Sequence, residues 1–182
     1  MKLISNNVID ELNVTTRNVL VRVNIAWVRN ETDLRDTLDK LSKKEIPIFL
    51  DYPRGRKKPP QIDIELDTVV SMIKEYPLVC YFAISNVEKP SDINKLRKKL
   101  DENVLLVPKI ESVKGIKNIK EIVKVALTDV IMFDKEDLYS DVKQNNQEYL
   151  KYSKLLRDTC KEIDMGILEL QGVVFTTYGR KE

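Results

Sequence analysis

The sequence contains no histidine. This absence excludes Ser-His-Asp triads and histidine metal sites, and it removes the usual general base at neutral pH. Glycine is also scarce, and no two of the five glycines are spaced as in a P-loop or a dinucleotide-binding loop. Any catalysis must therefore depend on Lys, Arg, Asp, Glu, Ser or Tyr side chains, or on a bound metal.

Long apolar runs and an excess of one charge are missing as well. No run approaches the roughly 20 residues that span a bilayer, and the opening MKLISNNVIDELN lacks the apolar core of a secretion signal. The 31 basic and 29 acidic residues give a net charge of +2, which indicates no nucleic-acid partner and no membrane partner. Of the two cysteines, Cys80 lies in an apolar run that favours a buried, reduced thiol. We therefore expect a cytoplasmic protein.

What the sequence does contain is a regular alternation of apolar strand segments and helical segments, without strand hairpins. We expect strands at 19–26, 46–50, 78–84, 104–107, 130–133 and 166–170, with a stub at 2–5 and a further candidate at 173–176. Helices are expected at 33–42, 63–74, 92–100, 116–123 and 147–163. Nearly continuous apolar strands in this order indicate a parallel sheet covered on both faces by helices.

The length of 182 residues suits one domain, residues 1–182, with its own core. A closed eight-stranded barrel usually needs about 250 residues. We therefore predict an α/β fold of the trimmed or incomplete TIM-type (β/α) barrel. The alternative is an open, doubly wound sheet.

Polar residues end two successive apolar runs. Lys109 and Glu111 follow the run 104–107, and Asp137 follows the run 130–133. Polar residues at the carboxyl ends of parallel strands project from the same rim, so these three side chains should converge. Two carboxylates and one cation suit a divalent metal, Mg²⁺ or Mn²⁺, together with a small anionic substrate.

The segment RGRKKPP, residues 54–60, is a basic loop in which proline rules out a helix and glycine permits a turn. Arg54, Arg56 and Lys57 offer the side chains that suit phosphate. The loop is therefore either a phosphate-binding loop or a solvated loop.

Several blocks resemble the barrel domain of the pyruvate kinase family. KIESVKGIKNIKEI (109–122) resembles that family's K-I-E-N-x-x-G-x-x-N-x-x-E-I block, and VIMFDKEDL (130–138) resembles its G-I-M-V-A-R-G-D-L strand. YFAISNVEKPSDI (81–93), VRVNIAW (21–27) and IPIFLDYPRGRKK (46–58) are similar to further blocks in the same order. The resemblance implies a barrel of the phosphoenolpyruvate- and pyruvate-binding type with transferase (kinase) activity.

The resemblance also implies roles for individual residues. Lys109 would stabilise an enolate and the transferring phosphoryl group, and Arg22 would face the substrate phosphate, as catalytic residues. Glu111 and Asp137 would bind the metal, and Ser85 would line the substrate pocket with Arg22. Asn24 and Asp51 would be the remnant of a potassium site. Arg22 and Asp51 could equally form an internal ion pair at the mouth of the barrel.

The sequence also departs from that family. Ala26 and Tyr52 replace a serine and a threonine of the potassium site, so K⁺ binding is in doubt. Glu169, Leu170 and Gln171 replace the segment whose threonine assists proton transfer. The lid domain and the carboxyl-terminal effector domain of the family have no counterpart here, which puts nucleotide binding in doubt.

Three functions remain open. The first is metal-dependent binding of, or phosphoryl transfer on, phosphoenolpyruvate, pyruvate or a similar 2-oxo acid. The second is a metal-dependent carbon–carbon lyase of the citrate-lyase and oxo-acid-aldolase type, which also places a metal-binding Glu and Asp at the ends of two successive strands. The third is a non-catalytic barrel remnant that acts as a binding module. An incomplete barrel exposes a sheet edge, so we expect a homo-oligomer.

Overall fold

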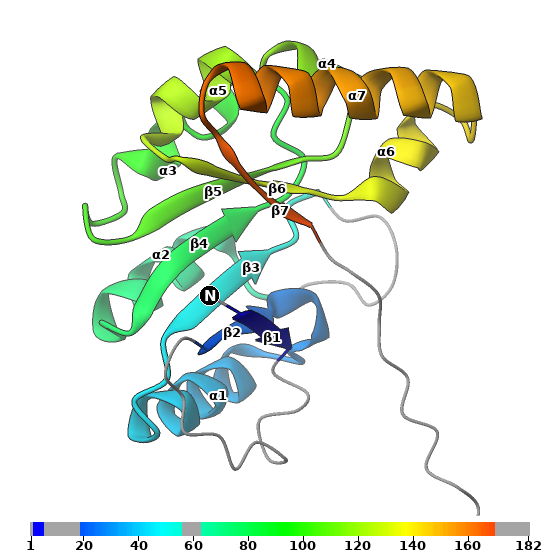
Figure 1. The fold of residues 1–182 in the computed structure, drawn as a ribbon. Helices are drawn as coiled ribbons and strands as arrows, with labels where there is room; N and C mark the ends of the chain where they lie inside the picture. The colour runs from blue at the N-terminus through cyan, green and yellow to red at the C-terminus, as the bar shows by residue number, and fades with distance from the viewer. Residues whose placement is uncertain (1, 6–18, 56–62, 170–182) are drawn as a thin grey trace, which may run out of the picture.

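In the part of the chain that the structure describes, seven parallel strands form one sheet, and their order in the sheet follows the sequence. The computed structural model describes residues 2–5, 19–55 and 63–169 (Figure 1). The strands, which pair in the order of the sequence, are β1 (Lys2–Ser5), β2 (Val19–Asn24), β3 (Ile48–Tyr52), β4 (Val79–Ile84), β5 (Leu105–Ile110), β6 (Val130–Phe133) and β7 (Gly166–Glu169). Every pair of neighbours is parallel.

Helices connect the strands. The described helices are α1 (Glu31–Lys43), α2 (Leu66–Glu75), α3 (Asn94–Arg97), α4 (Val113–Lys117), α5 (Ile119–Ala126), α6 (Lys135–Asp141) and α7 (Asn146–Glu162), with short 3-10 helices η2 (Ile25–Trp27) and η3 (Pro90–Asp92). None of the helices in the described ranges is long and apolar enough to cross a membrane.

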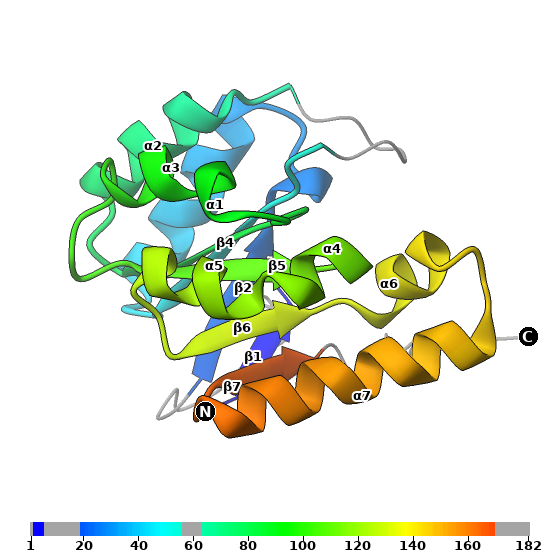
Figure 2. The same ribbon diagram turned by 90° about the horizontal axis from the view of Figure 1, so that it is seen from above.

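The strand order decides between the two predicted folds. A doubly wound sheet reverses its order at a switch point, whereas β1 to β7 follow one another without reversal. The sheet curls, and both edge strands β1 and β7 lie toward the same side of the molecule when it is seen from above (Figure 2). The structure therefore confirms the incomplete TIM-type barrel and excludes the open, doubly wound sheet.

The two faces of the sheet are covered differently. The helices lie in an arc along the outside of the curled sheet, from α1 through α2 to α7 (Figure 1). On the inner face, a second core consists of strand residues alone, namely Leu20, Phe49, Ala83, Val107 and Met132. The expectation of helices on both faces was wrong for the described residues, because a curled sheet buries its inner face against itself.

Local sequence explains most element boundaries. Asn30 begins α1 by accepting the backbone N–H of Asp33 at 2.9 Å through its side-chain oxygen. Leu34, Leu38 and Leu41 are fully buried, and their spacing places them on one helical face. Burying each of these side chains contributes about 1.5–3 kcal/mol.

Several elements differ from the expectation. The strand expected at 46–50 is shifted to β3, and the helix expected at 116–123 is divided between α4 and α5. The strand expected at 19–26 ends at Asn24, because the Asn24 side chain accepts the N–H of Ala26 at 3.0 Å and begins η2. The helix expected at 92–100 is divided between η3 and α3. Helix α6 was not expected; Asp134 caps it by accepting the N–H groups of Glu136 and Asp137. The strand stub at 2–5 is confirmed as β1, and the candidate at 173–176 lies outside the described residues.

A buried ionic site at the carboxyl ends of the strands

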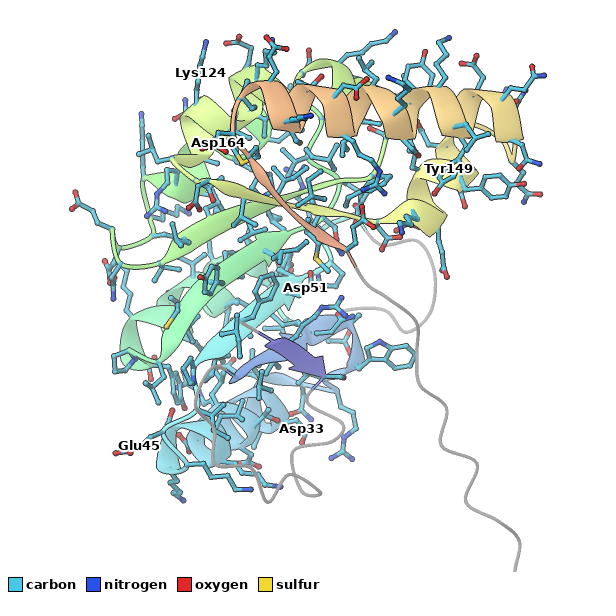
Figure 3. All side chains as sticks on the ribbon, in the orientation of Figure 1. Asp33, Glu45, Asp51, Lys124, Tyr149 and Asp164 are labelled. Carbon is cyan, nitrogen blue, oxygen red and sulfur yellow. The ribbon has the colours of Figure 1, made fainter. Side chains whose placement is uncertain are left out.

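The inner face of the sheet changes from apolar to charged toward the carboxyl ends of the strands. Side chains alternate between the two faces of a strand, so Arg22 and Asp51 share the inner face with Leu20 and Phe49 but lie nearer the strand ends. In Figure 3 Asp51 lies among the strand ends in the middle of the molecule, whereas Asp33, Glu45 and Lys124 lie on its periphery. Among the described residues, the buried charged side chains, namely Asp51, Lys109 and Glu111, lie at this rim.

Asp51 is the centre of the rim. Its carboxylate is fully buried and accepts a hydrogen bond from Nε of Arg22 at 3.0 Å through Oδ2, with a second, shorter contact from Nη2. Its other oxygen, Oδ1, lies 3.5 Å from Nζ of Lys109. The structure therefore shows the internal ion pair between Arg22 and Asp51 that was one of the two readings of these residues.

Lys109 is 6% exposed and has three partners. Its ammonium donates to Oγ of Ser85 at 2.9 Å and lies 3.1 Å from Oε1 of Glu111, in addition to its contact with Asp51. Burial alone would lower the pKa of Lys109, but the carboxylates of Asp51 and Glu111 outweigh it and raise this pKa above its ordinary value. Lys109 therefore carries its positive charge at neutral pH.

Glu111 follows β5 and is 4% exposed. Its Oε2 accepts the backbone N–H of Asn86 at 2.7 Å. Its Oε1 is buried and accepts no hydrogen bond of good geometry, although it faces Lys109 across the ion pair. Burial raises the pKa of Glu111, and Lys109 opposes this shift while the nearby charge of Asp137 adds to it. Oε1 is therefore held by its ion pair with Lys109 and has room to accept a hydrogen bond of better geometry.

Three carboxylates meet beside Lys109. Glu111, Asp134 and Asp137 each place an oxygen within 4.8 Å of the others, and Asp134 and Asp137 are half-buried. The structure thus brings together Glu111 and Asp137, which sequence reasoning had paired. Sequence reasoning did not include Asp134 among the candidate site residues. One signal in the sequence could have indicated Asp134. It directly follows an apolar strand, and an aspartate at such a position commonly caps the helix that follows.

The charges and the donor atoms of this rim fit a divalent cation. Two cations, Arg22 and Lys109, face four carboxylates, those of Asp51, Glu111, Asp134 and Asp137. The rim therefore has two negative charges in excess, and Mg²⁺ and Mn²⁺ prefer carboxylate oxygens. Glu111, Asp134 and Asp137 each have one carboxylate oxygen in this cluster.

Two other predicted site residues, Asn24 and Arg54, make different contacts. The side-chain oxygen of Asn24 is engaged in capping η2. Arg54 donates to backbone carbonyls of the loop that follows β4. Arg56 and Lys57 lie outside the described residues. The structure does not bring Asn24 and Arg54 into the group of Lys109, Glu111 and Asp137.

Comparison with known proteins now assigns the chain. The family model of HpcH/HpaI aldolase/citrate lyase matches residues 54–163, which include the strand ends of β4, β5 and β6. This chain belongs to the HpcH/HpaI aldolase/citrate lyase family.

Solved structures agree with this assignment at the level of the fold. A HpcH/HpaI aldolase/citrate lyase family protein of Burkholderia cenocepacia superposes with a TM-score of 0.68 at 9% identity, over 92% of this chain and 78% of that chain. The protein CitE of Mycobacterium tuberculosis, in complex with magnesium and pyruvate, superposes with a TM-score of 0.56 at 10% identity, over 82% of this chain and 63% of that chain.

The predicted membership of the pyruvate kinase family was wrong, and so was the predicted kinase, or transferase, class. A pyruvate kinase of Staphylococcus saprophyticus is 41% identical, but only over 64 residues, which span 33% of this chain and 11% of that protein. The family match over residues 54–163 is longer. The blocks around Glu111 and Asp137 misled because they are short, and short blocks do not separate one family of barrels from another.

Proposed function

We propose that this protein is a metal-dependent carbon–carbon lyase or aldolase that acts on a small 2-oxo acid. The observation that carries the proposal is the cluster of Glu111, Asp134 and Asp137 beside the protonated Lys109. Membership of the HpcH/HpaI aldolase/citrate lyase family supports the reaction class. The complex of CitE with magnesium and pyruvate supports the class of substrate.

The three carboxylates would hold Mg²⁺ or Mn²⁺. When bound, such an ion would polarise the carboxylate and carbonyl oxygens of the substrate. Asp134 is the N-cap of α6, Asp137 lies in the first turn of this helix, and Glu111 directly follows β5, so two neighbouring βα units supply the ligands. Ligands on packed elements hold their geometry better than ligands on free loops.

Lys109 and Ser85 would bind the oxygen on which negative charge develops. In the cleavage of a 4-hydroxy-2-oxo acid, the C4 hydroxyl loses its proton and the bond between C3 and C4 breaks. The electron pair stays on C3 as an enolate, an aldehyde leaves, and a proton adds to C3. A buried ammonium stabilises an enolate strongly because little water screens it. Lys109 is already hydrogen-bonded to Ser85, so this ammonium is held in place.

Arg22 would bind the carboxylate of the substrate. Its side chain is 15% exposed and lies on the same rim as Lys109, with Asp51 between them. A guanidinium can offer two parallel N–H donors to a carboxylate. Because the chain contains no histidine, proton removal falls to a carboxylate or to bound water, and the protonated Lys109 cannot perform it.

Enolate formation can be tested without knowing the aldehyde. We expect Mg²⁺ to promote exchange of the pyruvate methyl protons with deuterium, measured by NMR. Glu111→Gln should abolish the exchange, while Glu162→Gln, which alters an exposed carboxylate paired with Lys120, should leave it unchanged. Cleavage of 4-hydroxy-2-oxo acids should follow the same pattern. Absence of both reactions in the unaltered protein with Mg²⁺ would refute the proposal.

A second candidate is a non-catalytic binding module. It is favoured by the internal neutralisation of Arg22 and Lys109, which a purely structural rim would also require. This candidate predicts no binding of Mn²⁺ together with oxalate, a stand-in for enolpyruvate. It also predicts a stable homo-oligomer, and sedimentation as a monomer would count against it.

A further inference from the structure

Arg54, which follows β3, forms hydrogen bonds with three backbone carbonyls of the loop after β4. Its guanidinium donates from Nε to the backbone carbonyl of Ser85 at 3.2 Å and from Nη1 to that of Asp92 at 3.0 Å. A third donor, Nη2, contacts the carbonyl of Asn86 and lies 3.6 Å from the carboxylate of Asp92. All three nitrogens of the guanidinium are thus engaged by one loop, which argues against a phosphate-binding role for this residue.

Asn86 in turn donates a hydrogen bond to Arg54. Its side-chain Nδ2 donates to the backbone carbonyl of Arg54 at 2.6 Å. Asn86 has a φ of 56°, in the left-handed region that asparagine tolerates better than most residues, and Gly55 has a φ of 68° directly opposite it. The two turns that end β3 and β4 are therefore tied together by reciprocal hydrogen bonds around strained backbone.

The same Asn86 holds the carboxylate of Glu111. Its backbone N–H donates to Oε2 at 2.7 Å, while Oε1 lies 3.1 Å from Nζ of Lys109. A carboxylate oxygen of Glu111 also belongs to the cluster with Asp134 and Asp137. We propose that Arg54 is a positioning residue for Glu111: it fixes the turn at Asn86, and this N–H in turn orients the Glu111 carboxylate toward a divalent cation. The proposal rests on the proposed function, because it assigns Glu111 to the metal.

The physical reason is the geometry of the guanidinium. Its donors lie in one plane with fixed spacing, so it can bind three carbonyls of one loop at once, and a lysine ammonium cannot reproduce this arrangement. Without Arg54 the turn would lose its largest set of hydrogen bonds, and the φ of 56° at Asn86 would no longer be enforced. A shift of the N–H would then turn the Glu111 carboxylate.

Arg97 provides a matched control. It is half-buried like Arg54, and its guanidinium donates to the carbonyls of Val104 at 2.7 Å, Leu100 at 2.9 Å and Asp101 at 2.6 Å. These carbonyls precede β5, whereas Glu111 follows it, so this clamp is at the opposite end of the strand. Loss of Arg97 should therefore lower the stability as loss of Arg54 does, but it should leave the position of the Glu111 carboxylate unchanged.

The test measures binding of Mn²⁺ alone, by electron paramagnetic resonance of the free ion, on the full chain. We expect Arg54→Met to weaken binding by about tenfold or more, as is usual when a residue that orients a metal ligand is removed. Arg54→Lys should weaken it as well, because one ammonium cannot replace the planar donors. Arg97→Met should leave the affinity unchanged while lowering the melting temperature by a comparable amount.

Asn86→Gly keeps the backbone N–H and tolerates the positive φ but removes Nδ2. We expect a smaller loss of affinity than in Arg54→Met, and less than additive loss in the double variant, because both changes break one clamp. If Arg54→Met does not fold, the Mn²⁺ affinities of Arg54→Lys and Asn86→Gly are compared with those of the unaltered protein and of Arg97→Met instead.

The outcomes separate the two proposals. If the unaltered protein binds Mn²⁺ and Glu111→Gln abolishes binding, the metal site stands; equal affinity in the Arg54 variants, or an equal loss in Arg97→Met, then overturns the role of Arg54 alone. If the unaltered protein does not bind Mn²⁺, the metal site and the role of Arg54 fall together.

Discussion

Arg22 of β2 and Asp51 of β3 form an ion pair across two neighbouring strands, and the carboxylate of this pair has no solvent exposure. Asp51 also faces Lys109, so one buried carboxylate neutralises two cations. Taking charges out of water is costly, and such a group stabilises the fold only while its partners remain in place. The rim is therefore sensitive to the loss of any one charge, and most sensitive to the loss of Asp51.

Asp51→Asn should lower the free energy of unfolding by about 3–5 kcal/mol, because it leaves Arg22 and Lys109 buried with too little negative charge. The measurement is urea denaturation followed by circular dichroism. Arg22→Met should cost less, since Asp51 would still pair with Lys109. A loss below about 1 kcal/mol in Asp51→Asn would show that water compensates the two cations.

Asp134 combines two roles that one substitution can separate. Asparagine caps helices as well as aspartate does, so Asp134→Asn should keep the cap of α6 while removing a charge from the carboxylate cluster. We expect an unchanged or slightly higher melting temperature in the absence of metal, and weaker binding of Mn²⁺ by calorimetry. Asp134→Ala should lose both the cap, at about 1 kcal/mol, and the affinity. Full affinity in Asp134→Asn would remove Asp134 from the metal site.

Phe49 tests the inner core of the half-barrel. Its side chain is fully buried and stacks on Tyr81 with ring centroids 5.8 Å apart. Phe49→Ala should lower the free energy of unfolding by about 3–5 kcal/mol through lost burial and a cavity. Leu150→Ala, on the exposed face of α7, should change it by less than about 0.5 kcal/mol. If Phe49→Ala costs as little as Leu150→Ala, the inner face is not a packed core.

Cys160 predicts a dependence of stability on alkaline pH. Burial raises the pKa of this thiol to about 11 from an ordinary value of 9.0, although Arg157 opposes the shift. The unfolded chain therefore loses this proton at lower pH than the folded chain does, and stability falls as the pH rises from about 9 to about 11. The slope due to this thiol is at most about 1.4 kcal/mol per pH unit.

The comparison with Cys160→Ala isolates this effect, because other groups also titrate in that range. Chemical unfolding at several pH values should show a steeper decline for the unaltered protein than for Cys160→Ala. If the free energy of unfolding declines equally with pH in both proteins, folding does not raise the pKa of the Cys160 thiol.

The candidate site was predicted from the sequence to the extent that it lies on strand ends. Lys109, Glu111 and Asp137 follow two apolar runs, and parallel strands bring such residues to one rim regardless of the details of packing. Asp134 and Asn86 were missed because both belong to turns. Their positions depend on where α6 begins and on a positive φ, which no periodic pattern in the sequence reports.

The assignment to a family was limited for a related reason. Blocks such as those around Glu111 and Asp137 are short, and the match to a pyruvate kinase spans only 33% of this chain. Only the longer match across residues 54–163 shows the family. The correction of the family leaves the predicted metal-binding rim unaffected, because the positions of Lys109, Glu111 and Asp137 at strand ends do not depend on the resemblance to pyruvate kinase.

The sequence by itself determined the alternation of strands and helices, the parallel sheet and the absence of any histidine-based chemistry, because these depend on composition and on periodicities within single segments. Tertiary structure decided the rest. The unreversed strand order made a half-barrel with a self-buried inner face, placed Asp51 between Arg22 and Lys109, and aimed the N–H of Asn86 at Glu111. These relationships join residues from different strands, so their geometry depends on the curvature of the whole sheet and on the turns that end each strand.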